Sequence, residues 1–337
     1  MSLVAAVAVA GLSTTASAKS MEESIKGVDF SGYVRYRYTN GADNAESHKY
    51  KTVFKVKSKV NDSVNAFIKV TNESAVDDAS GDADPTHAAV KCANFQMNLG
   101  GNTVIVGKQG LQTPFAALSD QQGTGIVAVA PMGAMTLAGG WYFNTDATAG
   151  VGGADLGGLN IAAIAAMGKA GAVDYAAWLA DVSNGATAMN LNVAGTVGAV
   201  NLELNHASVD YDVGANPTQT RVVASGKAGA ATVAAGVVMT GDEGGDVTLG
   251  DVDAQANFDL EDLSAHMTTD DTVIYVGVHA PVGATTVGLE YAAADEADAD
   301  ETMLSVAYKM SSNFKISGFA TSGDLGDKTR LEVKYTF

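Results

Sequence analysis

Basic side chains recur at every second position in two neighbouring segments near the start of the 337-residue chain. These cations are Arg35, Arg37, Lys49, Lys51, Lys55, Lys57 and Lys59. The positions between them are mostly aromatic or β-branched, as at Tyr36, Phe54 and Val56. A period of two is that of a β-strand, whereas a helix at about 100° per residue would scatter the cations around its axis. Such a face is unusual as solvent surface and natural on the wall of a water-filled pore, where it sets an electric field.

Acidic residues gather instead in the long segments between the predicted strands. They include Asp77, Asp78, Asp82, Asp84, Asp242, Glu243, Asp246, Asp295, Glu296, Asp298, Asp300 and Glu301. Carboxylates clustered in this way concentrate cations through their summed field. Calcium is the one cofactor that such loops could hold, but the spacing of an EF-hand loop is absent. Solvated negative charge is the preferred interpretation, and no defined metal site is predicted.

The residues that usually carry catalysis, metal binding or nucleotide binding form no recognisable motif. Cys92 is the single cysteine, which excludes an internal disulfide and a CxxC zinc motif. The five histidines include no HExxH pair, and the glycine-rich segments 150–153 and 241–245 lack the lysine of a phosphate-binding loop. We therefore predict that the protein is not an enzyme. A hydrolase with a Ser–His pair stays an alternative, because its residues need not be adjacent in sequence.

Composition narrows the class of protein further. Hydrophobic residues make up 47% of the chain and charged residues 17%, against about 25% charged in an average domain. The formal net charge of −18 argues against a surface that binds a phosphate backbone, so nucleic acid is excluded as a partner. No proline-rich or charged linker divides the chain, which predicts a single domain.

The basic faces must belong to β-strands. The same alternation of polar and apolar residues recurs along the chain as far as the terminal segment 330–337. The connectors between strands differ in kind. Short ones with tight-turn residues lie at 61–63, 100–102, 131–133, 198–199, 281–283 and 311–313, and long ones lie at 40–48, 72–86, 144–157, 211–218, 241–250 and 294–301. Antiparallel strands of about ten residues with short periplasmic turns and longer extracellular loops are typical of an all-β transmembrane barrel. Counting alternating segments gives nearer twenty strands, with doubtful ones around 90–109 and 263–279.

Two segments could also be interpreted as helices. Residues 125–143 are uncharged and long enough to span a bilayer as a helix. Pro131 and Gly133 in the middle favour two strands joined by a turn. Residues 161–180 are alanine-rich but contain Asp174 and a glycine-bounded break, so we expect a second hairpin there.

Aromatic residues indicate that the apolar faces meet lipid. Phe30 and Tyr38 share one face of the first predicted strand, eight positions apart. In a tilted strand, the distance between them along the membrane normal is close to the height of the apolar band of an outer-membrane barrel. Other rings fall near predicted strand ends, where an interfacial girdle forms: Tyr50, Trp141, Phe143, Tyr291, Tyr308, Phe314 and Tyr335. The same rings could form the core of a soluble sandwich, but the cationic opposite faces argue against it.

Residues 1–18 predict a cleaved signal peptide. They are uncharged and end on Ala16-Ser17-Ala18, an A-x-A cleavage pattern. The usual basic start is missing, which we interpret as a leader truncated at its beginning. Residues 19–26 are predicted as a short periplasmic segment, and residues 27–337 as the barrel.

Two segments resemble the Campylobacter-type major outer membrane proteins, a family of general porins. Residues 22–38 read EESIKGVDFSGYVRYRY and resemble the start of the mature family members. Residues 102–114 read NTVIVGKQGLQTP and are similar to the strand that leads into the third loop, and the terminal Phe337 also agrees. The resemblance implies an 18-stranded barrel, commonly trimeric, whose third loop folds inward. We therefore expect eighteen strands, within a range of sixteen to twenty.

With this resemblance, two groups of residues become candidates for the pore lining. The basic wall comprises Arg35, Arg37, Lys51, Lys55, Lys57 and Lys69. The candidate constriction loop, residues 108–122, contributes Lys108, Gln112, Thr113, Asp120, Gln121 and Gln122. An acid on this loop opposite a basic wall would produce a transverse field that orients dipolar solutes.

The expected function is that of a general diffusion porin in the outer membrane of a Gram-negative bacterium. It would be a water-filled, weakly cation-selective channel for ions and small hydrophilic solutes, formed by a homotrimer in contact with lipid and lipopolysaccharide. Two alternatives stay open. An autotransporter-type translocator barrel would have about twelve strands and a plugging helix, and a surface adhesin built as a solenoid would show a fixed repeat, which we do not find.

Overall fold

The computed structural model describes residues 27–41, 46–77, 87–111, 113–115, 121–146, 158–247 and 269–337. The predicted signal peptide, 1–18, and the predicted periplasmic segment, 19–26, lie outside these residues. Within the described ranges, no helix is long and apolar enough to cross a membrane.

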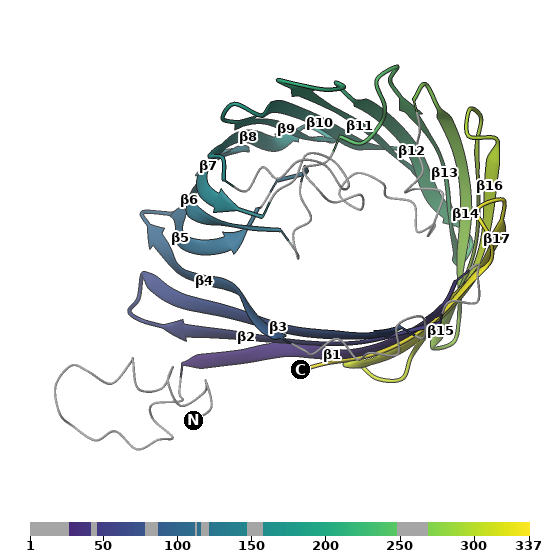
Figure 1. The fold of residues 1–337 in the computed structure, drawn as a ribbon, viewed down its shortest axis with the longest axis horizontal. Helices are drawn as coiled ribbons and strands as arrows, with labels where there is room; N and C mark the ends of the chain where they lie inside the picture. The colour runs from purple at the N-terminus through teal and green to yellow at the C-terminus, as the bar shows by residue number, and fades with distance from the viewer. Residues whose placement is uncertain are drawn as a thin grey trace.

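In the described part of the chain, eighteen antiparallel strands form one closed sheet (Figure 1). The first nine are β1 (Val28–Asn40), β2 (Glu46–Lys59), β3 (Val64–Asp77), β4 (His87–Leu99), β5 (Asn102–Gly110), β6 (Gln122–Met132), β7 (Met135–Thr145), β8 (Ile161–Ala170) and β9 (Val173–Val182). The second nine are β10 (Ala186–Val197), β11 (Val200–Tyr211), β12 (Thr218–Ala228), β13 (Ala231–Thr240), β14 (Thr272–Val282), β15 (Thr285–Ala294), β16 (Ala299–Lys309), β17 (Phe314–Gly323) and β18 (Lys328–Thr336). Each strand pairs with its neighbours in sequence, and β1 also pairs with β18, so the prediction of an 18-stranded barrel is confirmed.

The two regions that the alternating pattern left doubtful differ in the structure. The doubtful region 90–109 does hold strands, β4 and β5, whereas in 263–279 the described residues contain only the start of β14 at Thr272. Both predicted hairpins are present, as β6–β7 and β8–β9. Pro131 and Met132 lie inside β6, so the turn is at 133–134 rather than at 131–133 as predicted.

The two faces of the sheet differ as the period of two requires. Large apolar side chains stand exposed on the outside, among them Phe30, Phe54, Ile126, Ile164, Leu289 and Leu304. Exposed apolar surface that surrounds the whole sheet is the property of a wall facing lipid. Aromatic pairs reinforce this belt, with ring centroids 5.5 Å apart for Trp141 and Phe143 and 5.0 Å apart for Tyr36 and Tyr50.

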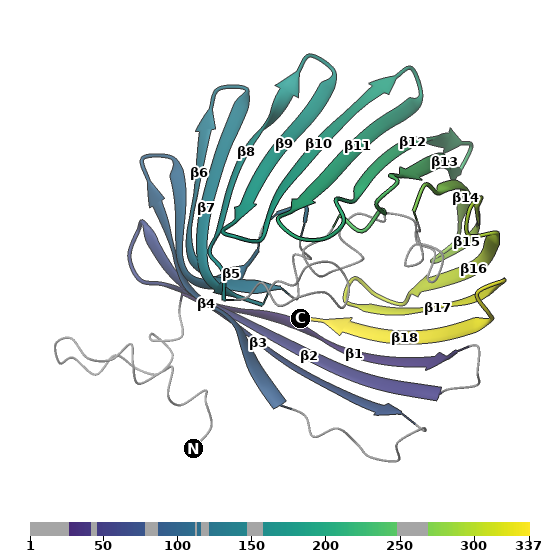
Figure 2. The same ribbon diagram turned by 45° about the horizontal axis from the view of Figure 1, so that its top comes forward.

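The chain end seals the barrel where β18 meets β1 (Figure 2). The backbone N–H of Phe337 donates to the carbonyl of Gly32, and the N–H of Gly32 donates back to Phe337. The ring of Phe337 packs against Phe54, with centroids 5.8 Å apart. Gly32 is required here because a Cβ would sit 2.0 Å from the carbonyl oxygen of Val53 on β2.

Part of the inner wall is apolar and is covered by loop residues. Small and aliphatic side chains from β6 to β11 form this inner cluster: Val127, Tyr142, Ile161, Ala163, Ala180, Val182, Ala186, Ala188, Ala207 and Val209. Leu111, Phe115 and Val247 belong to the same cluster although they lie in connections between strands. The loops after β5 and β13 therefore reach into the barrel at these residues.

The translocator alternative is not supported by this fold. The barrel has eighteen strands rather than about twelve. An adhesin solenoid is likewise incompatible with a closed antiparallel meander.

Candidate functional site

A chain of ion pairs crosses the inner wall from β18 to β3. Arg37 on β1 pairs with Glu332 on β18 at 2.9 Å, and Arg35 lies 3.9 Å from the same carboxylate. Arg35 also reaches Glu73 on β3 at 3.5 Å, and Lys51 on β2 reaches Glu73 at 2.8 Å. Side chains from four adjacent strands thus form one network, because closure of the barrel brings the last strand beside the first.

The network modifies the predicted basic wall. Three of its six predicted residues, Arg35, Arg37 and Lys51, share two glutamates. Their side chains are only 11–24% exposed, so these charges are partly desolvated and held in fixed positions. Glu73 and Glu332 were not among the predicted site residues, although the alternation placed Glu332 on one face with basic neighbours.

The remaining residues of the basic wall lie on the same inner face, further along β2 and β3. Lys55 stands directly opposite Lys69, and Lys57 stands opposite Phe67. Lys55 and Lys57 are exposed, and Lys69 is half-buried. The six predicted residues therefore share one continuous region of the inner wall.

The described part of the predicted constriction loop is packed against the inner wall. Leu111 and Phe115 are 2% and 0% exposed, and Thr113, Gln121 and Gln122 are buried as well. The N–H of Leu111 donates to the carbonyl of Gln121 at 3.1 Å, which joins the two ends of the loop. Gln112 and Asp120 lie outside the described residues.

Lys108 takes a different position from its predicted loop partners. It is exposed and stands opposite Ala93 and Thr124, on the parity of β5 that faces outward with Val104 and Val106. Gln109, the next residue, points inward, is 4% exposed, and donates from Nε2 to the carbonyl of Gly125. Strand parity is the signal that distinguishes the two residues.

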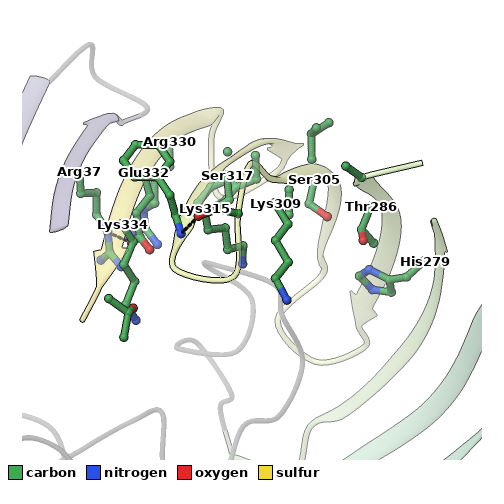
Figure 3. Close-up of a pocket in the computed structure, with 18 of the residues that line it drawn as sticks. Arg37, His279, Thr286, Ser305, Lys309, Lys315, Ser317, Arg330, Glu332 and Lys334 are labelled. Carbon is green, nitrogen blue, oxygen red and sulfur yellow. Dashed lines mark hydrogen bonds and ion pairs between the residues drawn. The ribbon is translucent and has the colours of Figure 1, made fainter. Parts of the chain in front are cut away.

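Further cations line the inner wall on β16, β17 and β18, next to the strand β1 of the basic wall (Figure 3). A cavity of about 880 Å³ is lined by basic residues of β16–β18 together with Arg37: Lys309, Lys315, Arg330 and Lys334. The guanidinium of Arg330 lies 4.8 Å from the ring centroid of Phe319, and the Lys334 ammonium lies 4.4 Å from that of Tyr33. The predicted basic wall is therefore extended by three more strands.

One more ion pair and one His–Glu contact lie on the inner wall away from this region. His279 on β14 lies 2.8 Å from Glu290 on β15, whose side chain is fully buried. Arg221 on β12 lies 2.5 Å from Glu203 on β11, and the Arg221 side chain is 6% exposed. Neither pair was predicted. Each joins residues on two different strands, and the register between those strands could not be obtained from the sequence.

The described residues hold no group of three or more His, Cys, Asp or Glu side chains that could ligate a metal ion. The predicted acidic residues Asp77, Asp78, Asp82 and Asp84 all lie outside the residues whose side chains are described. Calcium binding at these loops therefore stays a prediction.

A closed 18-strand barrel with an apolar outer belt and a charged inner wall is the architecture of an outer-membrane porin. The model of the Campylobacter major outer membrane protein family matches residues 1–211. The chain belongs to this family, as its first strand and third-loop segment suggested. No curated protein matches its sequence.

Solved structures share the fold at low sequence identity. Pseudomonas aeruginosa OccK5 (OpdH) is 12% identical, with a TM-score of 0.78 over 93% of this chain and 98% of that one. Pseudomonas aeruginosa OpdK, solved with vanillate, is 14% identical, with a TM-score of 0.75 over 93% and 99%. Acinetobacter baumannii OccAB3 is 12% identical, with a TM-score of 0.73 over 92% and 98%. Family membership, together with the barrel, makes the protein an outer-membrane diffusion channel.

Proposed function

We propose that the channel is a general porin with a weak preference for cations, open to ions and small hydrophilic solutes. The observation that carries this proposal is the ion-pair network of Arg35, Arg37, Lys51, Glu73 and Glu332 on the inner wall. Fixed opposite charges on a pore wall favour hydrated and dipolar solutes over apolar ones, without a binding step specific to one solute. Solutes of the size of vanillate, the molecule in the OpdK structure, fall within this class.

The cation preference is attributed to the long loops. In the part of the chain that the structure describes, acidic residues cluster after β13 and β15, and include Asp242, Glu243, Asp246, Asp295, Glu296 and Asp298. With a net charge of −18 on the whole chain, the loop end of the barrel attracts cations. The basic inner wall opposes this attraction, which is why we expect the preference to be weak.

The constriction is assigned to the loop between β5 and β6. Burial of Leu111 and Phe115 against the inner cluster supports a loop that occupies part of the barrel's cross-section. We propose that Asp120 and Gln112 set up a transverse field opposite the basic wall, and that Thr113, Gln121 and Gln122, which are buried, hold the ends of the loop.

The further proposals concern export and assembly. We propose that residues 1–18 are removed as a signal peptide, that residues 19–26 remain in the periplasm, and that the barrel assembles as a homotrimer. Its outer belt would contact lipid, and its loops would contact lipopolysaccharide, bridged by calcium where carboxylates cluster. No catalytic role is proposed.

A reversal-potential measurement tests the selectivity. Purified protein in a planar bilayer between 1:10 KCl solutions should give a small potential of the sign expected for cations, and the potential should shrink as salt is raised because loop charges are screened. A potential of the opposite sign would overturn the assignment of selectivity to the loops. Liposome swelling with sugars of increasing size should decline smoothly, and uptake of one sugar alone would contradict a general channel.

A further inference from the structure

Five cations form a single row across five neighbouring strands of the inner wall. Lys309 on β16 is directly opposite Lys315 on β17, and Lys315 is directly opposite Lys334 on β18. The row continues through Arg35 on β1 to Lys51 on β2. Like charges placed directly opposite each other destabilise an antiparallel pair. Four consecutive pairs of this kind therefore oppose folding of this wall unless anions neutralise them.

The two ends of the row differ in how they are neutralised. Arg35 and Lys51 have the carboxylate of Glu73 as a partner. Lys309, Lys315 and Lys334 have no ion pair with any carboxylate in the described part of the chain. Lys309 and Lys315 are exposed, and Lys334 lies over the ring of Tyr33. Three adjacent ammonium groups are thus available to a ligand.

The three lysines lie at the mouth of the barrel that carries the short turns. Lys309 is the last residue of β16 and Lys315 the second residue of β17, on either side of the turn 310–313. Lys334 is two residues before the end of β18. All three line the 880 Å³ cavity, and Figure 3 shows them on neighbouring strands. Ser317 lies two residues beyond Lys315 on β17 and lines the same cavity. Because they face the lumen, the ligand comes from the aqueous phase rather than from the lipid.

We propose that Lys309, Lys315 and Lys334 form a binding site for a small multivalent anion carrying two or three carboxylate or phosphate groups. Neighbouring strands are about 4.8 Å apart, so each ammonium group can contact a separate anionic group of one small molecule. A monovalent anion would neutralise one lysine and leave the repulsion between the others. The row thus selects by the number of charges on the ligand, and Ser317 supplies a hydroxyl that can bond the same ligand.

Binding also has a consequence for transport. An anion held at this mouth cancels the positive charge of the site, so the acidic loops then dominate the field along the pore. The channel should become more cation-selective when the site is occupied. This consequence rests on the proposed diffusion function, whereas binding itself can be measured without transport.

The binding experiment uses titration calorimetry on the purified full-length protein in detergent. The probes are tricarballylate, which carries three carboxylates, and acetate, which carries one, at matched ionic strength. We expect saturable binding of tricarballylate and none of acetate. The triple variant Lys309→Gln, Lys315→Gln and Lys334→Gln should bind tricarballylate about tenfold more weakly.

Lys227→Gln is the matched control, because Lys227 also faces the lumen near a short turn, on β12, but bonds only to Thr232 among the described residues. It should bind tricarballylate as the unaltered protein does. Single Lys315→Gln, which removes the middle charge, serves if the triple variant fails to fold, and it should weaken binding in the same direction. Equal binding by Lys315→Gln and Lys227→Gln, or equal binding of acetate and tricarballylate, would overturn the proposal.

Bilayer recordings separate this inference from the proposed function. Tricarballylate added on one side should raise the cation preference of the unaltered channel but not of the triple variant. A protein that binds tricarballylate yet gives no channels would contradict the diffusion function alone. A protein that conducts but binds no tricarballylate would contradict the site alone.

Discussion

Arg37 donates two hydrogen bonds to one oxygen of Glu332, from Nε at 3.1 Å and from a terminal nitrogen at 2.9 Å, across 295 positions of sequence. The two residues are directly opposite each other on β1 and β18, where the barrel closes. Charge-assisted bonds of this kind are stronger than bonds between neutral groups, and here they join the first strand to the last. One contact therefore contributes both to closing the barrel and to the charge of the pore.

Replacing Glu332 with Gln should weaken the closure and change the selectivity. The substitution leaves Arg37 and Arg35 half-buried without this carboxylate, which should lower the free energy of unfolding by about 1–3 kcal/mol. It also makes the inner wall more positive, so cation preference should fall. Urea unfolding in detergent, followed by tryptophan fluorescence, measures the first effect, and reversal potential measures the second. Unchanged values for both would show that the contact has no energetic weight.

Removing the arginines themselves should have the opposite electrical effect. The double variant Arg35→Ala, Arg37→Ala deletes two lumen-facing cations, so cation preference should rise and single-channel conductance should change. Lys169→Ala is a suitable control, because Lys169 is exposed, pairs with Asp174 at the β8–β9 turn, and lies far from the network. The assignment of these arginines to the pore lining is contradicted if conductance and ion preference stay at the unaltered values.

The buried ring of Phe115 should hold the constriction loop in place. Phe115 is 0% exposed within the inner cluster, and a buried Phe→Ala change typically costs about 3–5 kcal/mol. The lost packing should release the loop from the inner wall rather than unfold the barrel. Phe115→Ala should therefore give larger and noisier channel openings. Phe143→Ala removes an equal ring from the outer belt and should leave conductance unchanged. Identical conductance in both variants would mean that the loop does not narrow the pore.

Two glycines should differ sharply in their tolerance of alanine. A Cβ at Gly32 would lie 2.0 Å from the carbonyl oxygen of Val53, whereas the nearest atom to a Cβ at Gly139 is 3.8 Å away. Gly32→Ala should therefore reduce the yield of folded barrel, because β1 and β2 must separate. Gly139→Ala should fold normally. The heat-modified shift of folded barrels on an SDS gel reports the yield, and equal yields would refute the close approach of the two strands.

The period-two pattern predicted most of the fold because each strand of a barrel must present one face to lipid. It placed Arg35 and Lys51 on a common inner face, since residues of one parity share a face whatever the register. Local breaks, with Pro131 in one segment and glycines before Asp174 in the other, favoured hairpins over helices. The count of eighteen strands came from the family resemblance rather than from the pattern.

The carboxylates that pair with these basic residues could not be predicted from the period-two pattern. Glu73 meets Arg35 and Lys51 only because of the register among β1, β2 and β3, and Glu332 meets Arg37 only because the barrel closes. The row from Lys309 to Lys51 depends on the same two conditions. Lys108 illustrates the reverse case, because parity alone places it with the outward Val104 and Val106, although its position in the loop segment suggested a pore residue.

Single-channel recording of the purified protein in a planar bilayer tests the central claim most directly. A general diffusion channel predicts large, stepwise openings whose conductance grows nearly in proportion to KCl concentration, because the pore is wide and filled with water. A protein that is folded by its heat-modified gel shift, yet gives no steps or a conductance that saturates at low salt, would contradict the account.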